Sequence, residues 1–332
     1  MRLLLTFIFG LIVSFADAQR RGADFDAIDE RVRTIDAPTP DSLAFALTHV
    51  YTTDLEKTRA IFSWIAQHIE YNTGIFTGAR PVVQRTSSVD LFDTLSVWRP
   101  GIEMAAWRVM QKKLAVCEGY AKLFKVLCDY AGLHAEVVSG YAKCYLERND
   151  KFRTNHSWNA VMIDGKWYLL DMTWASGYIN YANEYVQHLD ENYFLTPPRE
   201  FIRDHYPENL HWTLLEDPPA LREFAYSPFR FKSFVKYGIH SYKPGNGTIE
   251  AAVGDTLQLE LEVGDAEKNR TISSDPFFDS TMLTNSPSSV FLLPSFQSKK
   301  VIYTYVVDSS PIEWLNLIYN DDTVLRYYLN RR

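Results

Sequence analysis

Residues 116–133 read VCEGYAKLFKVLCDYAGL, and this stretch indicates how the centre of the chain folds. Large apolar side chains recur three and four positions apart, which predicts an amphipathic helix: Tyr120, Leu123, Phe124, Leu127 and Tyr130. Gly132 is a typical stop signal for that helix. Cys117 would then lie before the helix or in its first turn.

A cysteine at a helix start has two interpretations. Backbone N–H groups and the positive end of the helix dipole would stabilise its thiolate and lower the thiol pKa from about 8.5 toward neutral. A single cysteine in such a place is nevertheless more often a packing residue, because free cysteine is among the most buried residue types. A reactive Cys117 would also need a base.

The base and its partner are found in a predicted β-hairpin. Residues 156–163 (HSWNAVMI) and 166–173 (KWYLLDMT) are strand-like runs, and Asp164-Gly165 between them is a strong signal for a two-residue turn. With a tight turn, Ile163 faces Lys166, and each step outward pairs the residue one position earlier with the residue one position later.

This register places a histidine next to a carboxylate. His156 is expected opposite Thr173, and Trp158 opposite Asp171. Since side chains alternate between the faces of a strand, His156 and Asp171 share one face as diagonal neighbours. Asp171 could then hold one imidazole nitrogen while the other faces a thiol, which is the logic of a catalytic triad.

Each of the three residues also has an ordinary structural explanation. A histidine on a strand beside aromatic residues is usually structural, and an aspartate at the end of a strand commonly forms a turn or a cap. The order of Cys117, His156 and Asp171 along the chain, combined with the hairpin geometry, favours the catalytic interpretation.

Two longer segments resemble a known family. Residues 116–143 and residues 156–177 are similar to the catalytic core of the transglutaminase-like superfamily, whose bacterial members often read C-[EQ]-G-Y-[AS], H-[AS]-W-N and D-x-T-W. Residues 59–76 resemble the helix before that core. Residues 192–215 resemble the segment after it in the kyphoscoliosis-peptidase branch.

The resemblance implies roles for the matching residues. Cys117 would be the nucleophile, His156 the general base and then acid, and Asp171 the group that orients His156. The implied fold class is α+β, with a papain-like core of helices packed on an antiparallel sheet. Compared with many relatives, the chain has a long insertion before the cysteine, at residues 77–113.

The oxyanion site is less well defined by the sequence. The backbone N–H of Cys117 is a natural first donor to a developing oxyanion. Trp107 and Gln111 are candidates for a second donor on chemical grounds alone. Trp158 is a third candidate for a contact with the oxyanion or the substrate.

The N-terminus and the charge indicate where the protein works. Residues 1–18 contain Arg2, an apolar run and Ala16-Asp17-Ala18, which predicts a cleavable secretory signal peptide. No cysteine follows that site, so a lipoprotein anchor is not indicated, and no later stretch predicts a membrane span. We expect a secreted or periplasmic protein. Its net charge of −7 argues against nucleic acids and anionic membranes as partners.

Cysteine and histidine spacing argues against disulfides at the predicted site and against a metal. Cys117 and Cys128 are three helical turns apart, too far to be bridged, so any disulfide would use Cys144. The chain has neither a CxxC nor an HExxH motif, and its histidines are scattered. We therefore expect no metal site and no cofactor.

The remaining sequence predicts the domain organisation. Residues 19–40 are interpreted as a flexible leader and residues 41–217 as the core, with a boundary at Glu216-Asp217-Pro218-Pro219. Residues 220–332 contain about six β-rich runs and predict a small β-sandwich as an accessory domain. These runs are 233–242, 247–253, 255–263, 289–294, 299–307 and 314–320.

The predicted function is an exported cysteine enzyme that attacks amide bonds of peptides or proteins through a thioester, with cell-wall peptides among the possible substrates. Hydrolysis is favoured over cross-linking, although the sequence does not choose the acceptor. The alternative is a catalytically inactive transglutaminase-like scaffold that binds a protein or peptide partner.

Overall fold

The computed structural model describes residues 23–74, 101–143, 154–180, 184–264, 288–293, 295–297 and 300–332. The chain divides into two compact units, residues 1–137 with 157–194 and residues 138–156 with 195–332. Strands β3 (Ala135–Ala142) and β4 (His156–Ile163) each have residues in both units.

Some predictions concern residues outside the described part of the chain. These are the signal peptide at residues 1–18, Cys144, and residues 77–100 of the long insertion. Among the described helices, none has the length and apolar character needed to cross a membrane.

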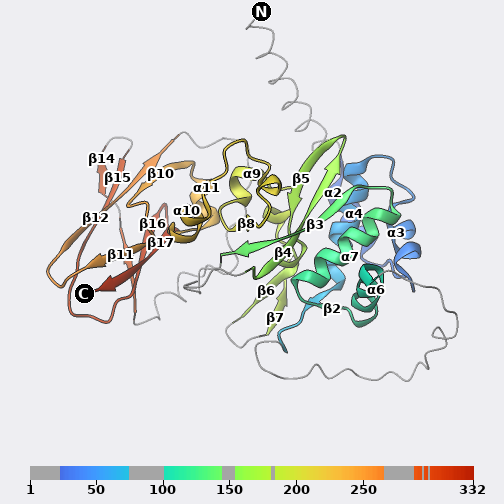
Figure 1. Cartoon of the computed structure of the whole chain (residues 1–332), viewed down its shortest axis with the longest axis horizontal. Helices are drawn as coiled ribbons and strands as arrows, with labels where there is room; N and C mark the ends of the chain where they lie inside the picture. Colours follow the sequence, from blue (N-terminus) through green and yellow to red (C-terminus); the bar gives the residue numbers. More distant parts are fainter. Residues whose placement is uncertain are drawn as a thin grey trace, which may run out of the picture. The chain divides into compact units, whose positions relative to one another are not determined.

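The first unit contains a cluster of helices that lies on one side of β4 and β5 (Lys166–Leu170) (Figure 1). Helix α4 is the central one, because ten of its fifteen residues are buried, and it contacts α2, α3, α7 and α8. The helices are α2 (Phe25–Val32), α3 (Pro40–Thr48), α4 (Asp54–His68), α6 (Gly101–Lys112), α7 (Cys117–Tyr130), α8 (Met172–Ser176) and the short η1 (Glu191–Tyr193).

Helix α7 matches the prediction for residues 116–133. It begins at Cys117, and Gly132 follows its end with a φ of 75°, a conformation that favours glycine. The N–H of Leu133 bonds to the carbonyl of Cys128 at 2.9 Å and closes the last turn. Tyr130 departs from the expected apolar face: it is exposed, and its hydroxyl donates to the carboxylate of Glu103 on α6.

The predicted hairpin is present with the predicted register. Asp164 and Gly165 both have positive φ values, 50° and 76°, as a tight two-residue turn between β4 and β5 (Lys166–Leu170) requires. Ile163 pairs with Lys166, and Asn159 pairs with Leu170.

The pairing ends earlier than expected. Thr173 belongs to α8, so the expected pairs His156–Thr173 and Trp158–Asp171 are not part of the ladder between β4 and β5. The physical reason is that Asp171 caps α8 and turns the chain out of the strand. The complete sheet has the order β5-β4-β3-β8, where β8 is His205–Pro207.

The leader prediction is wrong for residues 25–32, which form α2. Asp24 caps this helix, and Ile28 and Val32 are buried. Asp29 on α2 binds the guanidinium of Arg59 on α4 through two hydrogen bonds, one of them 2.8 Å from Nε. An isolated helix of eight residues is marginal in water, and this one is stabilised by its contact with α4.

Arg59 is a buried charge with two acidic partners. Its side chain is only 2% exposed, and it binds Glu191 as well as Asp29. We expect Asp29→Asn combined with Glu191→Gln to lower the free energy of unfolding by about 3–5 kcal/mol, because it leaves an uncompensated buried charge. Urea unfolding measures this loss.

The matched control for that double variant is Glu30→Gln on the same helix. Glu30 pairs with Arg33 at the surface, where both side chains are more than 60% exposed, so the expected loss is less than about 1 kcal/mol. Equal losses in the control and the double variant would contradict the assigned role of Arg59.

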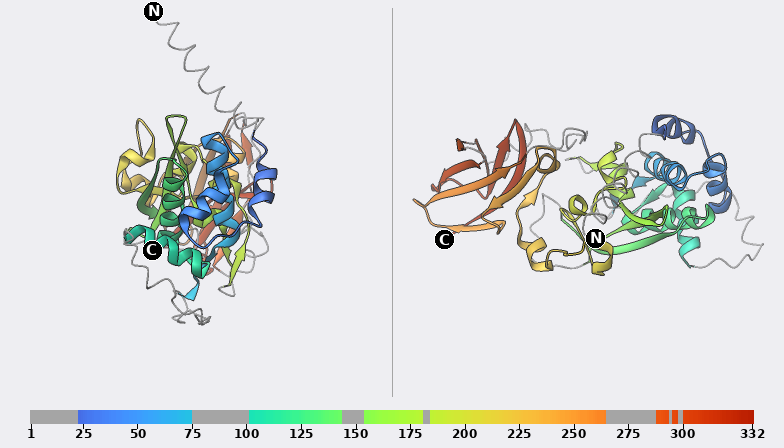
Figure 2. Two further views of the ribbon diagram at one scale, coloured as in Figure 1. Left: turned by 90° about the vertical axis from the view of Figure 1, so that its right-hand side faces the viewer. Right: turned by 90° about the horizontal axis from the view of Figure 1, so that it is seen from above.

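The second unit contains the predicted β-sandwich. One sheet has the order β10-β12-β15-β14, and the other has the order β11-β17-β16-β13 with β9 paired to β17; Figure 2 shows both sheets from above. Buried side chains of both sheets form one core cluster, and the Tyr303 hydroxyl donates to the carbonyl of Ile318 at 2.8 Å. The strands are β9 (Phe229–Arg230), β10 (Ile239–Lys243), β11 (Thr248–Ala251), β12 (Thr256–Val263), β13 (Ser289–Leu292), β14 (Ser295–Gln297), β15 (Lys300–Val306), β16 (Trp314–Tyr319) and β17 (Asp322–Arg331).

Some details of this unit differ from the prediction. The expected strand at 233–242 begins as helix α11 (Lys232–Lys236), and only its second half is strand β10, because Gly238 with a φ of 60° breaks the run. Strands β9, β14 and β17 were not predicted.

Residues 195–226, which lead into the sandwich, carry α9 (Pro198–Phe201), β8, η2 (Leu210–Thr213) and α10 (Leu221–Tyr226). They group with the second compact unit, although the sequence assigns residues up to 217 to the core.

Candidate active site

Cys117 is the first residue of α7 and is half-buried. The chain just before it is held by a short parallel ladder between β1 (Glu70–Tyr71) and β2 (Leu114–Ala115). Gly119 allows the helix start to approach β2, because a Cβ atom at this position would lie only 2.9 Å from the Cβ of Ala115. The positive end of the α7 dipole therefore lies at the Cys117 thiol.

Two buried polar side chains fix the position of α7. The Tyr120 hydroxyl donates to the carbonyl of Ile69 at 2.7 Å and thereby links α7 to the end of α4. The Asn159 amide on β4 donates to the carbonyl of Ala121 on α7 at 3.0 Å and to that of Glu136 on β3 at 3.1 Å. Asn159 therefore ties the cysteine helix to the sheet.

Asp171 is fully buried and caps α8. Its Oδ1 accepts hydrogen bonds from the backbone N–H of Thr173 at 2.8 Å and of Trp174 at 3.2 Å. The Asp171 N–H in turn donates to the carbonyl of Tyr193 at 3.0 Å. These bonds hold the carboxylate in one place and orientation.

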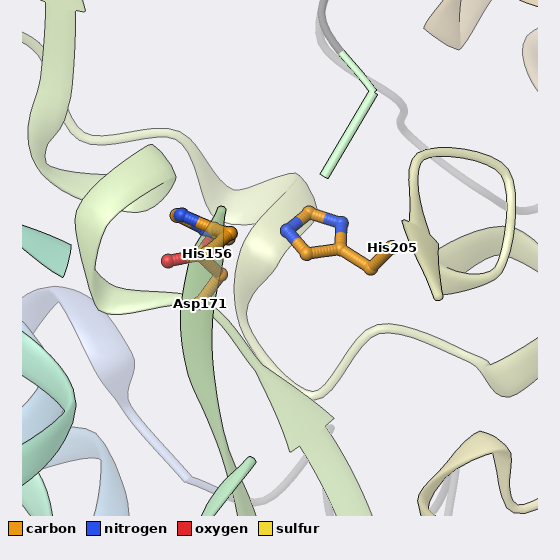
Figure 3. A group of neighbouring side chains, drawn as sticks. All are labelled: His156, Asp171 and His205. Atoms are coloured by element: carbon orange, nitrogen blue, oxygen red, sulfur yellow. The ribbon is translucent and has the colours of Figure 1, made fainter. Parts of the chain in front are cut away.

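His156, Asp171 and His205 lie together. One ring nitrogen of each histidine and one carboxylate oxygen all lie within 4.8 Å of one another, and all three residues are buried (Figure 3). The hairpin register predicts that His156 and Asp171 share a face, and this proximity agrees with it. His205 was not singled out from the sequence, because it lies 49 positions after His156 and no local pattern connects the two.

His205 is itself oriented by a carboxylate. Its Nδ1 lies 2.7 Å from Oδ1 of Asp204, whose Oδ2 accepts two hydrogen bonds from Arg203 at 2.5 and 3.1 Å. Burial alone would raise the pKa of Asp204, but the charges of Arg203 and His205 outweigh it and hold that pKa well below its usual range. The His205 ring stacks on Phe201 with ring centroids 4.2 Å apart.

Tyr71 is a second residue that sequence reasoning missed. Burial, together with the negative charges of Cys117 and Asp171, raises the pKa of Tyr71 to about 12. The side chain is thus close enough to both residues to sense their charges, and its hydroxyl stays protonated at neutral pH. The sequence alone does not place Tyr71 near Cys117, because that position depends on the pairing of β1 with β2.

The other candidates from the sequence lie in different surroundings. Trp107 is half-buried on α6, and Trp158 is almost completely buried on β4. Gln111 is exposed, and its Nε2 donates to the carbonyl of Pro38 at 3.2 Å, so its amide is engaged by the residues before α3.

The second cysteine of α7 differs from the first. Burial raises the pKa of Cys128 well above its usual value, which keeps its thiol neutral. Within the described residues, neither Cys117 nor Cys128 forms a disulfide.

A family profile described as the transglutaminase-like superfamily matches residues 41–172. The chain is 34% identical over 225 residues to the human kyphoscoliosis peptidase, an alignment that covers 66% of this chain and 31% of that protein. It is 34% identical over 241 residues to hillarin of Drosophila melanogaster, covering 68% of this chain and 27% of hillarin.

The matched region is thus about a third of the length of these curated relatives or less. Among solved structures, a TGase has 16% sequence identity and a TM-score of 0.28, with 53% of this chain and 40% of that chain covered.

Proposed function

We propose that the protein is a cysteine-dependent enzyme of the transglutaminase-like superfamily, whose profile matches residues 41–172, and that it attacks amide bonds of peptides or proteins. The observation that carries the proposal is the buried pair of His156 and Asp171, together with a half-buried cysteine at the start of α7. Cys117 is the nucleophile, His156 the base and Asp171 the group that orients the base.

The reaction proceeds through a thioester. His156 takes the proton of the Cys117 thiol, and the sulfur attacks the amide carbonyl to give a tetrahedral oxyanion. His156 then donates its proton to the leaving amine as the C–N bond breaks. In the second half, His156 deprotonates a water molecule that attacks the thioester, which yields a carboxylic acid and the free thiol.

The oxyanion is stabilised by donors at the start of α7. The backbone N–H of Cys117 supplies one hydrogen bond, and the helix dipole adds a favourable field. The hydroxyl of Tyr71 is a chemically suitable second donor, because Tyr71 pairs with Ala115, two residues before Cys117. It joins Trp107 and Gln111 as a residue to be tested in this role.

Hydrolysis is the favoured outcome over transfer to a second amine. The name of the human relative, kyphoscoliosis peptidase, supports this direction. We further propose export of the protein, since residues 1–18 have the pattern of a signal peptide. Peptides outside the cytoplasm, including those of the cell wall, would then be the accessible substrates.

Mass spectrometry of reaction products tests the proposal. Incubation of the protein with a peptide library and with purified peptidoglycan is expected to release shorter peptides that carry new carboxyl ends. Cross-linked products without cleavage would replace hydrolysis by transamidation. If the products match those of Cys117→Ala, the enzyme proposal fails and the alternative of an inactive peptide-binding scaffold takes its place.

The pH dependence of Cys117 alkylation separates the enzyme from the scaffold. An ion pair with His156 at the α7 terminus is expected to lower the thiol pKa below about 8.5, so that alkylation stays fast at acidic pH. In His156→Gln, the pH at which Cys117 alkylation is half-maximal should rise toward about 8.5. If the alkylation midpoint of the wild type lies near pH 8.5 and His156→Gln leaves it unchanged, the inactive scaffold is favoured.

A further inference from the structure

We propose that His156, Asp171 and His205 form a binding site for a divalent transition-metal ion of the zinc class, and that an ion in this site switches the enzyme off. Two imidazoles and one carboxylate are a ligand set that suits Zn²⁺. The three side chains come from β4, the start of α8 and β8, so the fold assembles the set from distant parts of the sequence.

The geometry of the three side chains is close to that of a metal site. Their candidate ligand atoms all lie within 4.8 Å of one another, whereas ligands about 2.1 Å from a tetrahedral ion are roughly 3.4 Å apart. Because Asp204 holds the His205 ring, rotation of the His156 imidazole about its χ angles is the movement that would shorten these separations, and it leaves the strands in place. Three protein ligands leave a fourth position for water or for a thiolate.

The surroundings of His205 are those of a metal ligand. Because Nδ1 of His205 faces Asp204, the ring nitrogen that points toward His156 and Asp171 in Figure 3 is Nε2. A carboxylate behind a ligating histidine is the usual arrangement in zinc sites, where it sets the tautomer and the ring orientation. Arg203 holds Asp204 in this position.

Burial adds a second argument. His156, Asp171 and His205 are 7%, 0% and 0% exposed, respectively. The ring centroids of the two histidines are 5.4 Å apart, close enough for both rings to face one shared ion. A cation held by both imidazoles and the carboxylate would place a positive charge beside the buried carboxylate of Asp171.

Inhibition follows from the use of His156, and this part rests on the proposed function. A nitrogen of His156 that binds a metal ion cannot accept a proton, and Asp171 would be drawn to the ion as well. His156 and Asp171 are then no longer available to activate Cys117. No bond is broken and no electron is transferred, so a chelator is expected to restore activity.

The test measures metal binding directly on the full chain without an affinity tag. Titration calorimetry with Zn²⁺ and absorption spectroscopy with Co²⁺ are expected to show one ion per chain in the wild type. His205→Asn is the informative variant, because its amide nitrogen can still donate to Asp204 in place of Nδ1 while the ligand Nε2 is lost. We expect its affinity to fall at least roughly 100-fold.

His211→Asn is the matched control, since His211 is exposed and lies outside the cluster; its affinity should equal that of the wild type. The inference is overturned if the wild type binds neither ion at about 1 mM. It is also overturned if His205→Asn binds as tightly as the wild type.

Activity gives an independent readout. Zn²⁺ is expected to stop peptide hydrolysis by the wild type, and EDTA to restore it. In His205→Asn, the same Zn²⁺ concentration should leave hydrolysis at that variant's own metal-free rate. If one ion binds at this site and hydrolysis continues, the switch is wrong. If the wild type hydrolyses nothing, the proposed function fails, while calorimetry and the Co²⁺ spectrum still decide the metal site.

Discussion

Replacement of Cys117 by alanine is expected to reduce amide hydrolysis by at least roughly 10⁴-fold, because removal of the nucleophile leaves only substrate binding and the oxyanion donors. Labelling of this position by a thiol-directed reagent should disappear as well. The half-buried Cys117 side chain contributes little to the core, so the unfolding transition should remain cooperative. Turnover is measured with the peptides found by mass spectrometry, and labelled positions are found by peptide mapping.

Cys128→Ala is the control for that experiment. Both cysteines lie on α7, but Cys128 is completely buried, and its pKa is raised by burial. We expect this variant to lose some stability from the small cavity and to keep its activity. Hydrolysis by Cys117→Ala within about tenfold of the wild type would remove Cys117 from the mechanism.

The central part of the fold could be predicted because its signals are local. The sequence of α7 carries its own apolar periodicity and its own stop at Gly132, and Asp164-Gly165 determines both the turn and the register of β4 and β5. A tight turn leaves only one pairing of the two strands. For that reason the proximity of His156 and Asp171 followed from a local feature.

Other elements depend on contacts that no local pattern contains. Helix α2 is stabilised by the pairing of Asp29 with Arg59, which lies 30 positions later. His205 reaches the cluster because β8 pairs with β3. Tyr71 reaches the surroundings of Cys117 because β1 pairs with β2. The two strand pairings therefore bring His205 and Tyr71 near the residues that the sequence predicts for the site.

Strand β17 illustrates a different difficulty. It lies between β11 and β16, and five of its ten residues are buried in one run, from Thr323 to Tyr327. Such a strand lacks the alternation of polar and apolar residues by which the other strands were predicted. The turn before it, with positive φ at Asn320 and Asp321, was the available local signal.

The second large effect is expected for Asp171→Asn, which should lower the hydrolysis rate by roughly 10²- to 10⁴-fold with little change in stability. An asparagine Oδ1 can still accept the hydrogen bonds from Thr173 and Trp174 that cap α8. Its side chain is neutral, however, so it cannot stabilise the imidazolium that forms when His156 takes the thiol proton. The loss should therefore appear in kcat, measured with the same peptides.

Two further variants separate the charge of Asp171 from its role as a cap. Asp171→Ala should lose about 1 kcal/mol more stability than Asp171→Asn, because it also removes the cap. Asp190→Asn changes another buried cap, whose Oδ1 accepts from the N–H of Asn192 at 3.0 Å, and should leave hydrolysis unchanged. If Asp171→Asn hydrolyses peptides as fast as Asp190→Asn, then Asp171 is only the cap of α8, and His156 must be oriented by another group. A rate loss confined to the Asp171 variants would mean that the carboxylate acts through its charge.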